Sequence, residues 1–135
     1  MNSPLHHLVI TVSDLACSKS FYSTVLTPLG WSVRGEGKDF VEFVPPGDPQ
    51  GVDFLLVLGL ARDLPKAAPF NRNNVGLDHY AFSIKKDQVQ PLLISLTNAQ
   101  IVPEDGGLTS DDFGGEGIFL TDPDGMKVEF HLSAA

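Results

Sequence analysis

The sequence predicts an α+β fold made of two tandem βαβββ modules, each with a strand, a helix and three further strands. The first observation is a repeated phrase, "LHHLVITVS" at residues 5–13 and "LDHYAFSIK" at residues 77–85, with a histidine third in each copy. The second is that apolar residues with helical spacing follow each copy. The third is that three strand-like runs follow each helix, separated by turns rich in glycine and proline. Each module needs the other to bury its sheet.

The first module opens with apolar residues in period two over residues 5–12, which is typical of a strand. Ser13 or Asp14 provides the N-cap of a helix through "LACSKSFYSTVL", residues 15–26, and Pro28 and Gly30 end that helix. Three strands are then expected at residues 31–34, 40–44 and 52–58.

A connector over residues 61–74 separates the modules, and the second module repeats the order of the first. We expect a strand at 77–84 and a helix capped by Asp87, with its apolar residues Val89, Leu92, Leu93 and Leu96 at i, i+3, i+4 and i+7. The tetrad "DPDG" at 122–125 is suited to a type I turn. Short strands are expected at 100–103, 117–121 and 126–132. The modules therefore span about residues 4–60 and 75–133 of a single domain, 1–135.

The composition limits the partners and the compartment. The net charge of −8 argues against nucleic acid and anionic membrane surfaces as partners. Cys17 is the only cysteine, so no disulfide framework is expected and a reducing, cytoplasmic location fits best. The longest apolar run, "FLLVLGLA" at 54–61, is far shorter than the roughly 20 residues of a membrane-spanning helix. We also expect a homodimer, because open sheets leave edges and apolar surface to be covered.

Strand parity brings three side chains that could bind a metal to the open faces of the predicted sheets. If Leu8, Ile10 and Val12 pack on the helix, His7 faces the other way, and the same parity applies to His79 in the second copy. On the last strand Met126, Val128 and Phe130 form the apolar face, which leaves Glu129 opposite. Two histidines and one carboxylate on three strands are the ingredients of a 2-His-1-carboxylate metal site.

Other polar residues have plainer interpretations. A single histidine on a strand is more often hydrogen-bonded or half exposed than a ligand, and we assign His6 and His131 that role. The acidic, glycine-rich segment at 104–117, "EDGGLTSDDFGGEG", has spacing unlike an EF-hand loop. We therefore interpret it as a solvated, flexible connection.

Three segments together resemble the vicinal oxygen chelate superfamily, which includes glyoxalase I, fosfomycin- and bleomycin-resistance proteins and extradiol dioxygenases. They are "HLVITVSDLACSKSFYSTVLTPLGW" at 7–31, "GLDHYAFSI" at 76–84 and "GIFLTDPDGMKVEF" at 117–130. The resemblance implies paired βαβββ modules in a cup-shaped, incomplete barrel around a divalent metal. Carried over position by position, it implies that His7, His79 and Glu129 are the metal ligands.

The chain departs from the glyoxalase pattern at the fourth ligand, which those enzymes take from the last strand of the first module. Aligning Gly51 with Gly125 places Leu55 opposite Glu129, and leucine cannot bind a metal. Shifting this alignment by two residues would place Asp53 there instead, as a weaker candidate for the fourth ligand. The remaining three-ligand pattern resembles extradiol dioxygenases, leaves open coordination positions, and favours Fe(II) or Mn(II), with Zn(II) or Ni(II) as alternatives. His131 is a candidate acid–base residue, and Thr11, Ser83, Leu55 and Phe119 are candidate substrate-pocket residues.

The function predicted from these patterns is that of a metal-dependent enzyme, a dioxygenase or lyase, acting on a small oxygen-rich substrate chelated to the metal. The alternative is a metal-free protein that sequesters a small molecule in the cup, as bleomycin-resistance proteins do. The metal triad separates the two hypotheses, because binding proteins of this family generally lack it.

Overall fold

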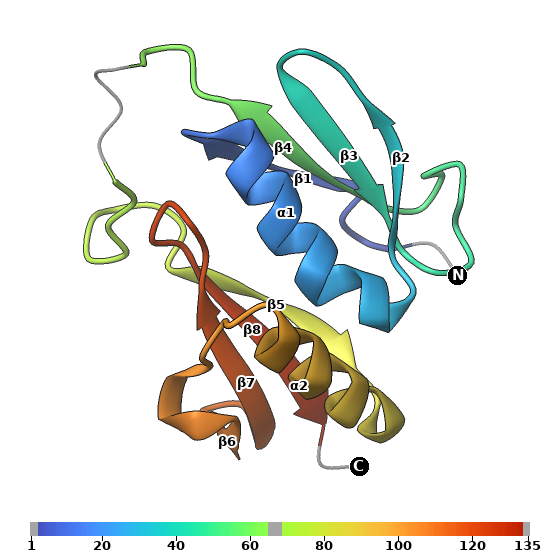
Figure 1. Cartoon of the computed structure of the whole chain (residues 1–135), viewed down its shortest axis with the longest axis vertical. Helices are drawn as coiled ribbons and strands as arrows, with labels where there is room; N and C mark the ends of the chain where they lie inside the picture. The colour runs from blue at the N-terminus through green and yellow to red at the C-terminus, as the bar shows by residue number, and fades with distance from the viewer. Residues whose placement is uncertain (1–2, 65–68, 134–135) are drawn as a thin grey trace. The chain divides into compact units, whose positions relative to one another are not determined.

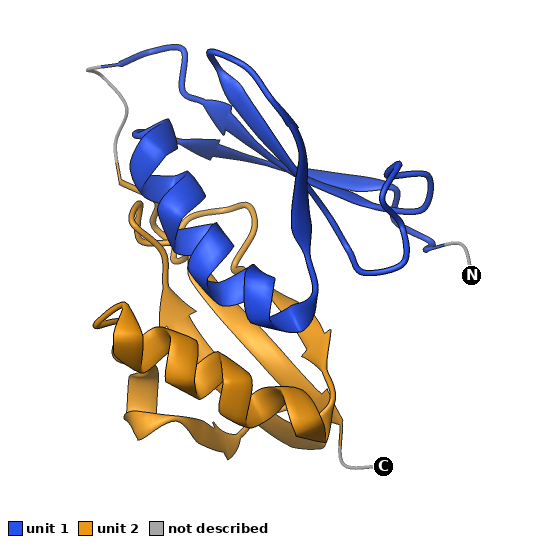
Figure 2. Ribbon diagram, turned by 45° about the vertical axis from the view of Figure 1, so that its right-hand side comes forward, with its two compact units in different colours: residues 1–68 blue, residues 69–135 orange. Residues whose placement is uncertain are grey.

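A computed structural model of the chain describes residues 3–64 and 69–133. The chain divides into two compact units, unit 1 at residues 1–68 and unit 2 at residues 69–135 (Figure 2). Each unit contains one helix of ten or more residues and one mixed four-stranded sheet (Figure 1).

Unit 1 follows the predicted order of strand, helix and three strands. Its elements are β1 (His7–Val12), α1 (Leu15–Leu26), the 3₁₀ turn η1 (Thr27–Leu29), β2 (Ser32–Glu36), β3 (Phe40–Val44) and β4 (Leu55–Leu60). The strand order is β1-β4-β3-β2, with β1 parallel to β4 and the other pairs antiparallel. Asp14 caps α1 by accepting the Cys17 N–H at 3.0 Å, as expected for one of the two predicted caps. Gly30 ends the helical segment in the left-handed region, at φ 87°.

The core of unit 1 lies between α1 and one face of its sheet. Tyr22, Val25 and Leu26 of the helix are fully buried, as are Leu56 and Leu58 of β4. Burying a side chain of this size contributes roughly 1.5–3 kcal/mol, so this apolar layer fixes which face of β1 is turned inward. The opposite face of β1 is left open.

Unit 2 repeats this plan. Its elements are β5 (His79–Ile84), η2 (Lys86–Gln88), α2 (Val89–Asn98), η3 (Glu104–Gly106), β6 (Leu108–Ser110), β7 (Gly115–Thr121) and β8 (Lys127–Ser133). The strand order is β5-β8-β7-β6, and β5 is parallel to β8. The buried apolar residues include Leu92 and Leu96 of α2 and Val128 and Phe130 of β8. The "DPDG" turn forms as predicted, with Gly125 N–H donating to Asp122 O at 3.0 Å.

Three local predictions are wrong for identifiable reasons. Asp87 is not an N-cap, because it lies inside η2, where Gln88 Oε1 accepts the Lys85 N–H at 2.9 Å. Residues 100–103 form no strand: Gln100 has φ 59°, which turns the chain after α2, and the short strand forms at β6 instead. Strand β4 begins at Leu55 rather than at residue 52, because the Asp48 carboxylate accepts the N–H groups of residues 52–54. Of the predicted connector, residues 65–68 lie outside the described residues.

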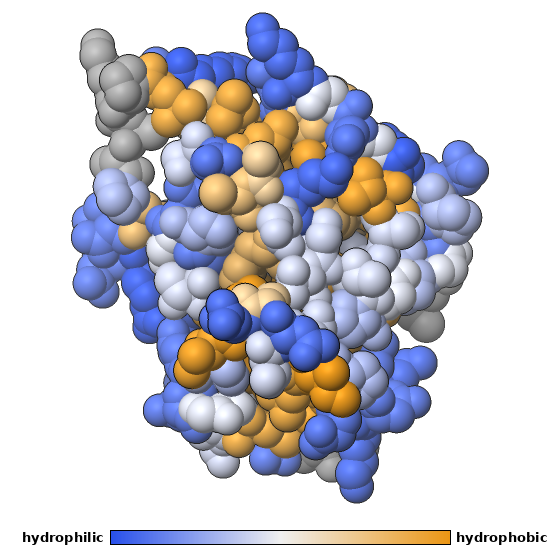
Figure 3. Space-filling model, viewed as in Figure 1, coloured by the Kyte–Doolittle hydropathy of each residue, from blue (hydrophilic) through white to orange (hydrophobic). Residues whose placement is uncertain are grey.

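The α+β prediction with two βαβββ modules is confirmed, whereas the arrangement of the modules as a cup in a single domain, and the homodimer, stay predictions. Within the described residues, no helix has the length and hydrophobicity that a membrane crossing requires. On the face seen in Figure 3, hydrophobic residues occur in separate groups between hydrophilic ones.

Candidate metal centre

His79 and Glu129 lie side by side on the open face of the sheet in unit 2. They come from the parallel neighbours β5 and β8, whose register pairs His79 with Lys127 and Ala81 with Glu129. Alternation puts His79 and Glu129 on the same face, away from α2. His79 Nε2 is 3.3 Å from Glu129 Oε1. This pairing agrees with the parity argument made from the sequence.

The second nitrogen of His79 is held by a carboxylate. His79 Nδ1 is 2.6 Å from Asp78 Oδ1, so a neutral ring that donates from Nδ1 directs its Nε2 lone pair at the Glu129 oxygen. His79 Nε2 and Glu129 Oε1, 3.3 Å apart, are then two atoms that can both bind a cation placed beside them. A histidine that is oriented by a carboxylate behind it is also the usual form of a metal-binding histidine. The residues present therefore fit a divalent metal.

Glu129 is a buried carboxylate whose Oε2 atom lacks a hydrogen-bond donor among the described residues. The residue is 1% exposed, and its Oε2 makes no hydrogen bond to the described residues. Burial raises the pKa of Glu129 above its ordinary value, and the neighbouring Asp111 carboxyl adds to the rise. Gly117 on β7 provides the space, because a Cβ there would lie 2.9 Å from Glu129 Oε2. A buried ionisable oxygen is costly unless something positive meets it.

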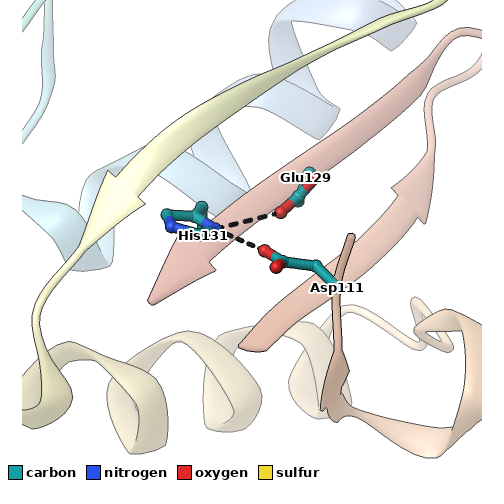
Figure 4. A group of neighbouring side chains, drawn as sticks. All are labelled: Asp111, Glu129 and His131. Atoms are coloured by element: carbon teal, nitrogen blue, oxygen red, sulfur yellow. Dashed lines mark hydrogen bonds and ion pairs between the residues drawn. The ribbon is translucent and has the colours of Figure 1, made fainter. Parts of the chain in front are cut away.

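Asp111, Glu129 and His131 form a second cluster (Figure 4), in which each offers a potential ligand atom within 4.8 Å of the others. Glu129 and His131 come from β8, and Asp111 lies between β6 and β7. His131 Nδ1 contacts Asp111 Oδ2 and lies 3.4 Å from Glu129 Oε2. The Asp111 hydrogen bond raises the pKa of His131, although burial opposes this.

Asp111 is the residue of this centre that sequence reasoning missed. Its side chain is only 1% exposed, so the prediction that it belongs to a solvated connection is wrong. Burial opposes its ionisation, but the N–H groups of Phe113 and Gly115 and the side chains of Glu129 and His131 lower its pKa to about 2. The sequence signal available was an Asp followed closely by glycine, which favours a turn closed by the Asp side chain.

His7 lies on the open face of unit 1. It is exposed at the start of β1, and its Nδ1 is 2.9 Å from His6 Nδ1. It belongs to a different unit from His79 and Glu129. That His7 completes the metal site stays a prediction.

The strand register corrects the position that was aligned with Glu129 in unit 1. Strand β1 pairs Val9 with Val57, just as β5 pairs Ala81 with Glu129, so Val57 takes the place assigned to Leu55. The glycine alignment is two residues out because the loop before β4 is longer than the turn before β8. Asp53 lies outside β4, and its N–H donates to Asp48 Oδ2 at 2.9 Å. The equivalent strand position is aliphatic, as expected.

The predicted pocket residues fall into both units. In unit 2, Phe119 lines a pocket of about 220 Å³ together with His79 and Glu129. Ser83 lines a neighbouring pocket of about 360 Å³, which also contains His131. In unit 1, Thr11 lines a hollow of about 460 Å³, whereas Leu55 is 9% exposed at the start of β4. Their contact with a substrate stays a prediction.

Comparison with known proteins establishes the family. A sequence profile of the Glyoxalase/Bleomycin resistance protein/Dioxygenase superfamily matches residues 4–130. The chain belongs to this superfamily. Two relatives in the glyoxalase/bleomycin resistance/dioxygenase superfamily are proteins named metallothiol transferase FosB. The protein from Lysinibacillus sphaericus (strain C3-41) is 31% identical over 94% of this chain and 80% of its own length. The protein from Staphylococcus saprophyticus is 29% identical over 97% of this chain and 78% of its own length.

Solved structures of the superfamily share the fold. The glyoxylase/bleomycin resistance protein/dioxygenase domain from Frankia sp. EAN1pec aligns with a TM-score of 0.74 and 26% identity, covering 98% of this chain and 99% of that domain.

Proposed function

We propose that this member of the superfamily is a metal-dependent enzyme in which His7, His79 and Glu129 hold a divalent metal that binds a small, oxygen-rich substrate. The observation that carries the proposal is the pair formed by His79 Nε2 and the buried Glu129 Oε1, 3.3 Å apart with Asp78 behind the histidine. Such a pair lacks only a cation and a further ligand, which His7 would supply.

The residues have separate roles in this proposal. His79 and Glu129 hold the metal from unit 2, and burial of Glu129 excludes water from its carboxylate. A bound metal would act as a Lewis acid toward substrate oxygens. Phe119 and Ser83 line the pockets beside the two ligands, where they would orient the substrate. Fe(II) or Mn(II) is favoured, since three protein ligands leave coordination positions open.

Thiol transfer is the first chemistry to test, because the two relatives are named metallothiol transferases. In that reaction a thiol sulfur would form a bond to an electrophilic carbon of the acceptor while the carbon–oxygen bond breaks. The thiol proton would pass to the released oxygen, so the step needs no oxidant. Dioxygenase and hemithioacetal isomerase chemistry remain the alternatives within the superfamily.

The first experiment measures metal content in protein purified without chelator, and then after anaerobic reconstitution with Fe(II), Mn(II), Ni(II) or Zn(II). We expect about one metal per chain, and a large loss of binding in His7→Ala, His79→Ala and Glu129→Gln. Glu116→Gln, which alters an exposed carboxylate on β7, is the matched control. Full occupancy in the His7→Ala/His79→Ala double variant would show that the ligands are wrong.

Activity assays on each reconstituted protein then separate the chemistries. Thiol consumption with small epoxides would support transfer, oxygen uptake with catechols would support the dioxygenase alternative, and isomerisation of glutathione hemithioacetal would support the glyoxalase alternative. A wild-type protein that binds no metal under any of these conditions would refute the enzyme proposal. The metal-free sequestration hypothesis would then take its place.

A further inference from the structure

We infer that Asp111 and His131 are positioning residues that orient the Glu129 carboxylate toward the metal, an inference that rests on the function proposed above. Neither residue needs to touch the metal or the substrate in this arrangement. They act on one oxygen of Glu129 and so determine where the other oxygen points.

The two oxygens of Glu129 face different histidines. Oε1 lies 3.3 Å from His79 Nε2, and Oε2 lies 3.4 Å from His131 Nδ1. Because the side chain is buried, the carboxylate cannot exchange these contacts for water. A positive or N–H-bearing group beside Oε2 therefore fixes the rotation of the carboxylate and leaves Oε1 for the metal.

Asp111 anchors His131 to the backbone of the following loop. Its Oδ1 accepts the N–H groups of Phe113 at 2.9 Å and Gly115 at 3.1 Å, which leaves Oδ2 for His131 Nδ1. A Cβ on Gly115 would lie 3.0 Å from His131 Cε1 and 2.4 Å from the Leu132 carbonyl oxygen. A larger residue at position 115 would therefore clash with the backbone of β8 and with the His131 ring.

The contacts of His131 Nδ1 favour positioning over ligation. Nδ1 is hydrogen-bonded to Asp111 Oδ2 and lies 3.4 Å from Glu129 Oε2, so a proton on Nδ1 is donated to Asp111 while the ring places this positive N–H edge beside Glu129. While it donates this proton, Nδ1 has no lone pair for a metal, so this nitrogen cannot bind a cation lying between it and the two carboxylates. Hydrogen-bonded partners of this kind typically change metal affinity by 10–100-fold when they are removed.

The test measures the Kd for Mn(II) and the visible spectrum of the Co(II)-loaded protein in four variants with intact thermal unfolding. Asp111→Asn keeps an oxygen for the loop but turns an NH₂ group toward His131. Asp112→Asn alters the exposed neighbour and is its control. His131→Leu removes the donor, whereas His131→Asn keeps an N–H near the position of Nδ1.

We expect Asp111→Asn and His131→Leu to weaken Mn(II) binding about 10–100-fold and to shift the Co(II) spectrum. Asp112→Asn and His131→Asn should stay within about threefold of wild type. The inference is wrong if all four variants bind like wild type. It is also wrong if Asp111→Asn abolishes binding while His79→Ala retains it, because the metal would then lie among Asp111, Glu129 and His131 themselves. A wild-type protein without metal binding would instead refute the proposed function on which the inference rests.

Discussion

Replacing Gly117 with alanine should displace the Glu129 carboxylate while leaving the rest of unit 2 folded. The new Cβ would lie 2.9 Å from Glu129 Oε2 and 3.0–3.1 Å from two ring carbons of Phe119. Carbon atoms do not approach a carboxylate oxygen this closely, so the carboxylate must move by several tenths of an ångström. Movement toward solvent is restricted because Glu129 is 1% exposed. The carboxylate must therefore move relative to His79 or His131.

The size of the effect follows from these contacts. Inserting a methyl group into a packed site costs about 1–3 kcal/mol, and the lower entropy of the unfolded alanine chain offsets about 0.4–1 kcal/mol of that. We expect the free energy of unfolding to fall by up to about 2.6 kcal/mol. Metal affinity should fall about 10–100-fold, because the Glu129 oxygen leaves its place beside His79.

The assay compares urea unfolding and Mn(II) titration in Gly117→Ala with the same measurements in Gly59→Ala. Gly59 is the matched control, since it is a strand glycine in β4 and its Cβ would meet only Val9 Cγ1, at an ordinary 3.7 Å. This control should be as stable as wild type or up to about 1 kcal/mol more stable. If Gly117→Ala keeps both its unfolding free energy and its Mn(II) affinity, the Glu129 carboxylate does not lie over Gly117.

Four further predictions concern titration, stability and assembly. In the metal-free protein, NMR should give His131 a pKa above 6.5, and this pKa should return toward 6.5 in Asp111→Asn. The contribution of protonated His131 to stability is present below pH 6.5 and is lost as the pH rises through the folded pKa. Metal affinity should drop as the pH falls below about 6, because a histidine binds a metal only when it is neutral and because protons compete with the metal for Glu129, whose pKa lies above 4.5. An affinity that does not change with pH would exclude these residues as ligands. Asp48→Ala should lower the melting temperature by removing the acceptor of three N–H groups. Burial opposes ionisation of Asp48, but those N–H groups hold its pKa below 3.8, so its contribution is present above pH 3.8 and is lost as the pH falls through the lower folded value. Light scattering at micromolar concentration should give the mass of a dimer, and a monomer would contradict the edge argument.

Much of the fold could be predicted because the apolar pattern of each element matches its burial. Strand β1 alternates from Leu8 to Val12 with the predicted parity, α1 begins at its predicted cap, and Gly30 ends the 3₁₀ turn that follows α1. The errors arise where side chains bind the backbone across a loop. Asp48 delays the start of β4, and no periodic pattern in the sequence reveals a carboxylate that reaches four to six residues ahead.

The candidate site was predictable only where it depends on strand parity. His79 and Glu129 lie on neighbouring strands with side chains on one face, which alternation alone requires once β5 and β8 are paired. Asp111 depends instead on how the segment after β6 folds back over β8, which brings it to His131, 20 residues further along the chain. An acidic, glycine-rich segment of this kind gives no sequence pattern that distinguishes a buried carboxylate from a solvated one.

The two units differ at one strand position, and that difference bears on the proposed chemistry. Each unit begins with a histidine on its first strand, but the position equivalent to Glu129 is Val57 in unit 1. The residue that β3 pairs with Val57 is Glu42, and Arg34 Nη2 holds its carboxylate at 2.7 Å. Unit 1 can therefore offer His7 but no ready carboxylate from these strands. A metal held by two histidines and one carboxylate keeps open positions for substrate oxygens, so we expect Val57→Glu to raise metal affinity while it lowers turnover. Higher affinity with unchanged turnover would show that the open position is not used by the substrate.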